Sequence, residues 1–292
     1  MEFYNGKEKQ AIVFSTFISA SDLNNLILDE TNSDLVIIDC RYFLTDPKLG
    51  YHQYKLQHIP GALFADLDNN LSGPIKNNTG RHPLPNLDIF TNWLIKNSIS
   101  KTNHVVIYDQ LGGGIAARLW LMLVQIGYES VRVLEGGIIN WKRLDYQLES
   151  GDEIRNVLSP EIDLKLPKRW EDGLYKIYSK SDVKEKINGE FNLIDSRSPE
   201  RYAGEVEPID TIAGHIPSAK NIYWQSHLEE NLLLKSLSDL KKIITEKVDL
   251  DEETVFYCGS GVTAAFNVLI MKHLELPNPG IYIGSWSEWI RD

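Results

Sequence analysis

Cysteine is scarce in this chain of 292 residues, which contains only Cys40 and Cys258. Two cysteines that lie far apart in unlike surroundings do not make a disulfide framework. Long apolar runs are absent as well, because no stretch reaches the ~18 residues that a membrane-spanning helix requires. The first ten residues are polar and lack the apolar core of a signal peptide. These absences predict a soluble, cytoplasmic protein in a reducing compartment.

Positive charge is also in short supply, because 41 acidic residues stand against 30 basic ones and the net charge is −11. Such a balance argues against nucleic acid and against an anionic membrane surface as partners. An anionic ligand must then be attracted by a local positive field, against the charge of the whole molecule. The sequence also lacks a cluster of metal-ligand residues. We therefore expect neither a metal nor an organic cofactor.

The most informative segment that is present runs from Val255 to Ala264. An apolar strand leads into Cys258, a short turn with Gly259 and Gly261 follows, and a nearly unbroken apolar helix extends from there to about Leu274. This order places the sulfur at the carboxyl end of a buried strand, facing backbone N–H groups and a helix amino terminus. Such a setting lowers a cysteine pKa from its free value of about 8.5. Cys258 is therefore predicted to be a thiolate nucleophile.

Cys40 has a different setting. It lies within an apolar run, and neither a glycine turn nor a helix start follows it. Free cysteine often serves as a small buried apolar residue. We expect this role for Cys40.

Two chemistries share the strand, cysteine, turn and helix arrangement. A cysteine phosphatase needs an arginine six positions after the nucleophile, to bind the phosphate bidentately. Ala264 occupies that position here. Transfer of a single sulfur atom does not need this arginine, so the turn favours sulfur transfer over phosphate ester hydrolysis.

The two halves of the chain resemble each other. Four short motifs recur in the same order and at nearly one spacing, which indicates a tandem duplication. The first copy has Ile37–Asp39 with Arg41, His58–Pro60 with Ala62, Ile107–Asp109, and Gly136 with Trp141; the second has Leu193–Asp195 with Arg197, His215–Pro217 with Ala219, Phe256–Cys258, and Gly284 with Trp289. We expect one domain over residues 12–150, a linker over 151–173 and a second domain over 174–292.

Each half alternates predicted strands and helices. This order predicts an α/β fold with a mainly parallel sheet and helices on both faces. In the second half we expect strands at 191–195, 221–223, 255–258 and 280–283, and helices near 181–187, 238–246 and 263–274. Ligands of such sheets bind beyond the carboxyl ends of the strands. Asp195, Arg197 and Cys258 all follow strand ends and should share one rim.

The duplication is asymmetric at the position that matters for chemistry. Asp109 stands in the first copy where the second copy has Cys258. A carboxylate cannot act as a sulfur nucleophile, so the first domain is expected to be catalytically silent. Its expected roles are to stabilise the second domain and to form a wall of the pocket.

The motifs together make the chain resemble two-domain rhodanese-type sulfurtransferases over essentially its whole length. The residues that carry the resemblance are Gly80–Pro85, Ala117–Trp120, Glu205–Pro208, Gly214–Pro217, Cys258–Thr263 and Gly284–Trp289. The family implies that Cys258 takes a sulfur atom from a small anionic donor and becomes a persulfide. It implies that the sulfur then passes to cyanide, a thiol or a thioredoxin-like acceptor, in two covalent steps.

The turn after the cysteine bears on the donor. In the family, two basic residues after the cysteine go with thiosulfate, whereas a Gly-Ser pair goes with 3-mercaptopyruvate. Gly259 and Ser260 therefore favour mercaptopyruvate. The resemblance further implies that Ser260, His82 and Asp68 transfer the proton that the departing enolate requires, which is general acid work.

Substrate binding is expected from the turn and from arginines. The resemblance assigns it to Arg201, with Arg197 and with the turn residues Gly259, Gly261, Val262 and Thr263. Asp195 and Arg197 have twins in Asp39 and Arg41 of the silent half, which favours a structural pairing instead. Ile209 and Asp210 stand where mercaptopyruvate-specific members carry a second arginine. Thiosulfate as the main donor, and a non-catalytic module that only relays sulfur, therefore stay open as alternatives.

Overall fold

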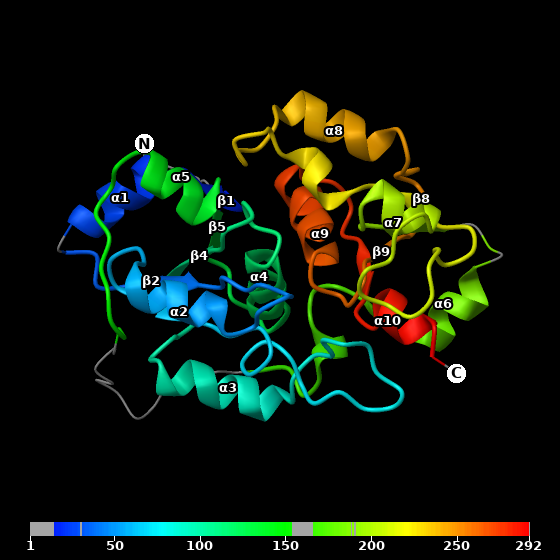
Figure 1. Ribbon diagram of the computed structural model, residues 1–292, viewed down its shortest axis with the longest axis horizontal. Coiled ribbons are helices and arrows are strands. Elements are labelled where there is room, and N and C mark those ends of the chain that lie inside the picture. The colour runs from blue at the N-terminus through cyan, green and yellow to red at the C-terminus, as the bar shows by residue number, and fades with distance from the viewer. Residues whose placement is uncertain (1–14, 30, 154–165, 188, 190, 292) are drawn as a thin grey trace, which may run out of the picture.

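The computed structural model describes residues 15–291 except 30, 154–165, 188 and 190. Figure 1 shows the elements of the first half in blue to green and those of the second half in green to red. The elements of the first half are β1 (Phe17–Ile18), α1 (Ala20–Leu28), β2 (Leu35–Asp39), α2 (Leu49–Leu56), β3 (Ala62–Phe64), α3 (Leu87–Lys96), β4 (His104–Tyr108), α4 (Ala116–Gln125), β5 (Val131–Leu134) and α5 (Gly137–Arg143). The elements of the second half are the 3-10 helix η1 (Trp170–Asp172), β6 (Ile177–Tyr178), α6 (Lys180–Lys186), β7 (Asn192–Asp195), α7 (Pro199–Ala203), β8 (Lys220–Asn221), the 3-10 helix η2 (Trp224–His227), α8 (Leu237–Thr245), β9 (Thr254–Tyr257), α9 (Ala264–His273), β10 (Gly280–Tyr282) and α10 (Ser285–Trp289).

The two halves have the same sheet topology. The strand order is β1-β5-β4-β2-β3 in one sheet and β6-β10-β9-β7-β8 in the other. All pairings between these strands are parallel. Strands β6 to β10 therefore occupy the same positions in the second sheet as β1 to β5 do in the first. The predicted duplication and α/β class are confirmed.

The predicted elements of the second half are confirmed to within two residues at each end. The sequence analysis did not find β6, α7 and α10, which contain two to five residues. Segments of that length are too short to show a hydrophobic period. The middle of the predicted linker, 154–165, lies outside the described residues.

Local sequence signals start several helices. The hydroxyl of Ser19 accepts a hydrogen bond from the amide of Asp22 at the start of α1. Ser179 does the same in a capping box with Asp182 at the start of α6. Such caps stabilise a helix by about 1 kcal/mol each. None of the helices in the described ranges has the length and apolar composition that crossing a membrane requires.

Alternating strand residues divide each half into two packed layers. Val105 and Ile107 of β4 pack with α3 and α4, whereas Val106 and Tyr108 pack with α1 and α5. In the second half, α8 and α9 cover one face of the sheet, and α6 and α10 contribute to the core on the other. The layers of α3, α4, α8 and α9 form one continuous core, with α4 and α9 side by side between the sheets.

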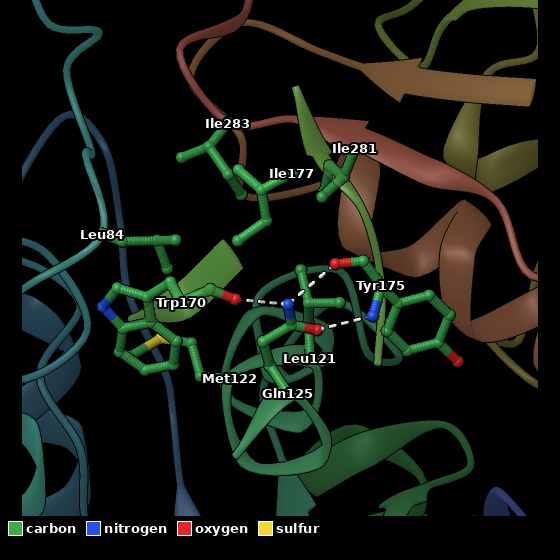
Figure 2. A pocket seen from close by; sticks show the side chains of 9 residues that line it. All are labelled: Leu84, Leu121, Met122, Gln125, Trp170, Tyr175, Ile177, Ile281 and Ile283. Atoms are coloured by element: carbon green, nitrogen blue, oxygen red, sulfur yellow. Dashed lines mark hydrogen bonds between the residues drawn. The ribbon is translucent and has the colours of Figure 1, made fainter. Parts of the chain in front are cut away.

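The start of the second half is anchored on α4 of the first. The Gln125 side chain donates to the carbonyls of Trp170 and Tyr175 at 2.6 and 2.8 Å and accepts from the Tyr175 amide at 2.8 Å. Figure 2 shows this clasp beside the apolar side chains of Leu84, Leu121 and their neighbours. The remaining cavity measures about 10 Å³, roughly the space for a single water molecule. The contact between the halves is therefore closely packed.

A buried histidine makes stability depend on pH. The Nε2 atom of His227 lies 2.7 Å from Oδ1 of Asn267, and the Asn267 amide donates to Ser196 and Ile222, so the neutral ring donates from Nε2. Burial lowers the pKa of His227 to about 4, against the opposing effect of the Asn267 hydrogen bond.

We expect the free energy of unfolding to decrease as the pH falls from about 6.5 toward 4. The neutral ring contributes fully above the unfolded pKa, and this contribution is lost as the pH falls through the folded pKa. A shift of this size corresponds to roughly 3 kcal/mol. Urea denaturation at several pH values in this range should show that the free energy of unfolding decreases less for His227→Gln than for the native chain. Parallel pH profiles for the two proteins would contradict the assignment.

Candidate active site

The cysteine loop follows β9 and leads directly into α9. Gly261 has a φ of +75°, and a Cβ atom there would lie 2.3 Å from the carbonyl oxygen of Ile283. Only glycine combines that backbone conformation with so close an approach. The loop therefore closes against the end of β10 and turns back toward the sulfur of Cys258.

The amino end of α10 fixes the orientation of the loop. The carbonyls of Cys258 and Gly259 accept hydrogen bonds from the amides of Trp286 and Ser287 at 3.0 and 2.9 Å. In a trans peptide unit the N–H points away from the C=O. The amides of Gly259 and Ser260 therefore face away from α10, toward the concave side of the loop.

The thiol of Cys258 lies in a cradle of amides. The Gly261 amide donates to its Sγ atom at 3.2 Å. Burial opposes ionisation, but the Thr263 hydroxyl and the amides of Ser260, Ala264 and Gly261 outweigh it, so the pKa of the thiol lies below its ordinary value. The Ala264 amide is the first of α9, a helix that has no capping side chain. The sulfur thus satisfies an otherwise unpaired group at the helix start, as the sequence predicted.

Cys258 is 2% exposed, yet it lines a cavity of about 350 Å³. Both halves of the chain contribute to this cavity. The first half supplies Tyr42, Leu44, Leu67, Arg81, His82, Leu111 and Ile115; the second supplies Arg201, Ile209, Tyr223, Trp224, Gln225, Cys258, Gly259, Ser260, Val262 and Thr263. The walls are largely apolar, with a few polar groups near the sulfur, as in a small-molecule site.

The three residues predicted to transfer protons lie in one row. The Ser260 hydroxyl is 2.7 Å from Nδ1 of His82, and Nε2 of His82 is 3.5 Å from a carboxylate oxygen of Asp68. The Tyr42 hydroxyl donates to Asp68 at 3.1 Å. The interaction with His82, followed by that with Tyr42, holds the pKa of Asp68 below its ordinary value despite partial burial. The row connects the cavity wall beside Cys258 with the surface.

Two guanidinium groups flank the loop. A Cβ atom on Gly259 would lie 3.0 Å from Nη2 of Arg81 and 3.5 Å from both terminal nitrogens of Arg201. Arg201 donates to Glu207 at 2.8 Å and to Asp210 at 3.3 Å, and Asp210 also pairs with Arg81. Arg81, from the first half of the chain, is thus a second arginine beside the loop.

Arg197 does not line the cavity. Its side chain is 1% exposed and pairs with Asp195 at 2.7 Å and with Glu207 at 3.2 Å. Its twin Arg41 pairs with Asp39 in the same way in the first half. The substrate-binding prediction for Arg197 is therefore corrected: its donors are used within the protein, and it holds Glu207 beneath Arg201.

The first half has the same cradle with a different anion in it. One carboxylate oxygen of Asp109 accepts from the amides of Leu111 and Gly113, and the other accepts from Ile115 and Ala116, all at 2.6 to 2.9 Å. Asp109 is fully buried, and Ala116 is the first residue of α4, which also lacks a capping side chain. The loop architecture of this fold therefore binds a two-atom anionic group through main-chain amides alone.

Asp109→Asn should destabilise the protein by roughly 3 kcal/mol or more. An amide nitrogen would face two N–H donors, so two hydrogen bonds to a charged acceptor would be lost and buried donors left unpaired. Urea denaturation would measure the change. Asp46→Asn is the control, because Asp46 is exposed and its carboxylate accepts a hydrogen bond from one amide of the described residues, that of Lys48. Equal stability of the two variants would contradict this account of the cradle.

Sequence reasoning did not assign a role to Arg81 or to Arg118. Arg81 stands directly before His82, and Arg118 is the one charged residue in the apolar stretch 115–124. The position of Arg81 beside His82 and the apolar surroundings of Arg118 are both visible in the sequence. Their meaning depends on which residues of the other half they reach, which the sequence does not display.

Comparison with known proteins agrees with this architecture. The rhodanese-like domain family matches residues 19–144 and again residues 179–292. The probable 3-mercaptopyruvate sulfurtransferase of Pseudomonas aeruginosa is 37% identical over 264 residues, covering 89% of this chain and 90% of the relative. A putative thiosulfate sulfurtransferase of Mycobacterium tuberculosis is 31% identical over 279 residues, covering 94% of each protein.

A solved structure is similar over the same extent. The crystal structure of SseA from Escherichia coli, described as a 3-mercaptopyruvate sulfotransferase with the rhodanese fold, is 30% identical. It superposes with a TM-score of 0.78, covering 94% of this chain and 99% of that one. The resemblance in sequence and the resemblance in structure therefore extend over both halves.

Proposed function

Because this chain belongs to the rhodanese family and carries two rhodanese-like domains, we propose that it is a sulfurtransferase that takes sulfur from 3-mercaptopyruvate onto Cys258. The persulfide so formed passes its outer sulfur to cyanide, a thiol or a thioredoxin-like protein. The observation that carries the proposal is a thiol with a lowered pKa among amide donors, at the wall of a cavity of about 350 Å³. The first domain, residues 12–150, is silent because Asp109 fills its cradle.

In the first step the Cys258 thiolate attacks the sulfur of the donor. The new S–S bond forms as the bond between sulfur and carbon breaks, and its electron pair leaves as the enolate of pyruvate. The proton on the donor thiol moves by way of Ser260 and His82 to the enolate carbon. One persulfide anion and one pyruvate result, so atoms and charge balance. Asp68 lies 3.5 Å from Nε2 of His82 and orients the ring for this transfer.

In the second step the acceptor attacks the outer sulfur of the persulfide. With cyanide the new carbon–sulfur bond gives thiocyanate, and the S–S electron pair returns to Cys258 as the thiolate. In the first half, four backbone amides donate hydrogen bonds to the two carboxylate oxygens of Asp109. This supports a persulfide in the matching cradle of Cys258, because a persulfide is also an anion with two acceptor atoms. Thiolate and persulfide are both open to oxidation, so we place the enzyme in the reducing environment of the cytoplasm.

Mercaptopyruvate is the proposed donor because its enolate leaving group requires a proton. The row of Ser260, His82 and Asp68 supports this choice, since thiosulfate would release sulfite, which needs no proton to leave. The names of the relatives include both donors. The test is to incubate the protein and cyanide with either donor and to measure thiocyanate. A higher kcat/KM with mercaptopyruvate is expected; a higher value with thiosulfate would reverse the donor assignment, and no thiocyanate from either would overturn the enzyme proposal in favour of a binding module.

Arg201→Ala should raise the KM for mercaptopyruvate roughly tenfold or more and change kcat less. A charged hydrogen bond to the donor carboxylate contributes about 1.5–3 kcal/mol. Steady-state kinetics would measure both constants. Arg169→Ala is a suitable control, because Arg169 is an exposed arginine paired with Asp172. Equal KM values for the two variants would remove Arg201 from the donor site.

A further inference from the structure

Arg118 is a buried cation at the contact between the two halves. It lies on α4, and its side chain has no exposed surface. Its guanidinium donates to three main-chain carbonyls: to Gly261 at 3.0 Å, to His82 at 3.1 Å and to Leu71 at 3.3 Å. One arginine of the silent half thus contacts the cysteine loop and the backbone of the histidine that faces it.

The charge of Arg118 lacks an ordinary partner. Within the described part of the chain, no carboxylate lies within ion-pair distance of its guanidinium, and its Nε atom has no hydrogen-bond partner. A buried charge without a counter-ion is strongly unfavourable. Such a residue is uncommon unless an anion nearby compensates for it.

The thiol of Cys258, when ionised, can supply this anion. Burial lowers the pKa of Arg118 to about 10, and the charge of ionised Cys258 opposes that effect. Arg118 therefore remains a cation at neutral pH. The two groups are linked through one residue, since Gly261 accepts from Arg118 through its carbonyl and donates to the Cys258 sulfur through its amide.

We propose that Arg118 is a positioning residue that holds the cysteine loop and the His82 segment in register and supplies a fixed positive charge for the Cys258 anion, in addition to the charges of Arg81 and Arg201. Its role toward the persulfide rests on the function proposed above, whereas its role toward the thiolate does not. The silent domain then contributes more than a wall to the site. It adds a buried cation to the guanidinium groups of Arg81 and Arg201, which flank the loop at Gly259.

The two parts of this role predict different effects for different substitutions. Arg118→Gln removes the charge and keeps a hydrogen-bond donor. Arg118→Lys keeps the charge and loses the forked contact to separate carbonyls. Arg132→Gln is the control, because Arg132 is a partly buried arginine of the first half, on β5, and lies outside the lining of the cavity.

The experiment measures the rate of iodoacetamide alkylation at Cys258 as a function of pH, read by peptide mass spectrometry, with the folded state of each variant checked by circular dichroism. We expect Arg118→Gln to move the midpoint of the profile upward by about one pH unit, which is a tenfold smaller thiolate fraction below both midpoints. Arg118→Lys and Arg132→Gln should remain close to the native profile. A native midpoint in folded Arg118→Gln would overturn the charge role.

Should Arg118→Gln fail to fold, Arg118→Lys decides the matter. A folded lysine variant with a native midpoint but a lower kcat for mercaptopyruvate supports both parts of the role. If the midpoint of alkylation in Arg118→Lys moves upward by one pH unit, the charge role is overturned, because the lysine variant still carries the cation. Alkylation needs no sulfur donor, so a native protein that shows the predicted thiol profile but forms no thiocyanate would refute the proposed function and leave this inference standing.

Discussion

Replacement of Cys258 by serine is expected to lower sulfur transfer from either donor by at least about 10⁴-fold. The hydroxyl of serine cannot form the persulfide, and loss of a covalent nucleophile removes the whole two-step path. Thiocyanate formation with cyanide as acceptor would measure the loss. The variant should fold normally, because serine is similar in size and the same amides can donate to its oxygen.

Cys40→Ser is the matched control for this prediction. Cys40 is fully buried, and burial, together with Asp39 and Asp109, raises the pKa of its thiol well above the ordinary value. A buried neutral thiol cannot serve as the nucleophile. The control should therefore retain activity, and loss of activity in a folded Cys40→Ser protein would contradict the assignment of the sulfur carrier to Cys258.

Ser260→Ala is expected to reduce kcat for mercaptopyruvate by roughly 10²-fold, the usual range for loss of a general acid or base step. Thiosulfate turnover by the same variant should change by less than about threefold, because sulfite leaves without a proton. His82→Gln should show the same division between donors, since His82 lies 2.7 Å from the Ser260 hydroxyl. The comparison separates proton transfer from general damage to the loop, which would slow both donors alike.

Steady-state kinetics with both donors, on native protein and on both variants, provide this measurement. Ser236→Ala serves as a control for a serine side chain, because Ser236 is a helix cap of α8 on the surface. Equal losses with mercaptopyruvate and thiosulfate would reject the proton-transfer role, and no loss with mercaptopyruvate would show that the enolate obtains its proton elsewhere.

The fold could be predicted largely from the sequence because its signals are local and occur twice. Strands that alternate with helices, and motifs repeated in the same order, indicate two parallel sheets without any knowledge of distant contacts. The Cys258 loop was predictable for the same reason, since Gly259 and Gly261 stand between a strand and a helix. The caps of α1 and α6 follow from serine and aspartate at fixed spacing.

The rest depended on contacts between the halves, which local patterns do not encode. Arg197 looked available for an anion, but Asp195 and Glu207 occupy its donors. Arg81 places a second arginine in the lining of the cavity, although it stands 128 residues before Ile209 in the chain. The significance of Arg118 appears only when the carbonyls of Gly261 and His82 are seen to meet at its guanidinium.

The most direct test of the account is the mass of the intact protein after incubation with mercaptopyruvate in the absence of an acceptor. We predict a gain of one sulfur atom per chain, located on the peptide that contains Cys258 and removed by cyanide with release of an equal amount of thiocyanate. Cys258→Ser should show no gain. An unchanged mass of the native protein, or a sulfur atom found on Cys40, would contradict the central claim that the amide cradle at Cys258 carries a persulfide.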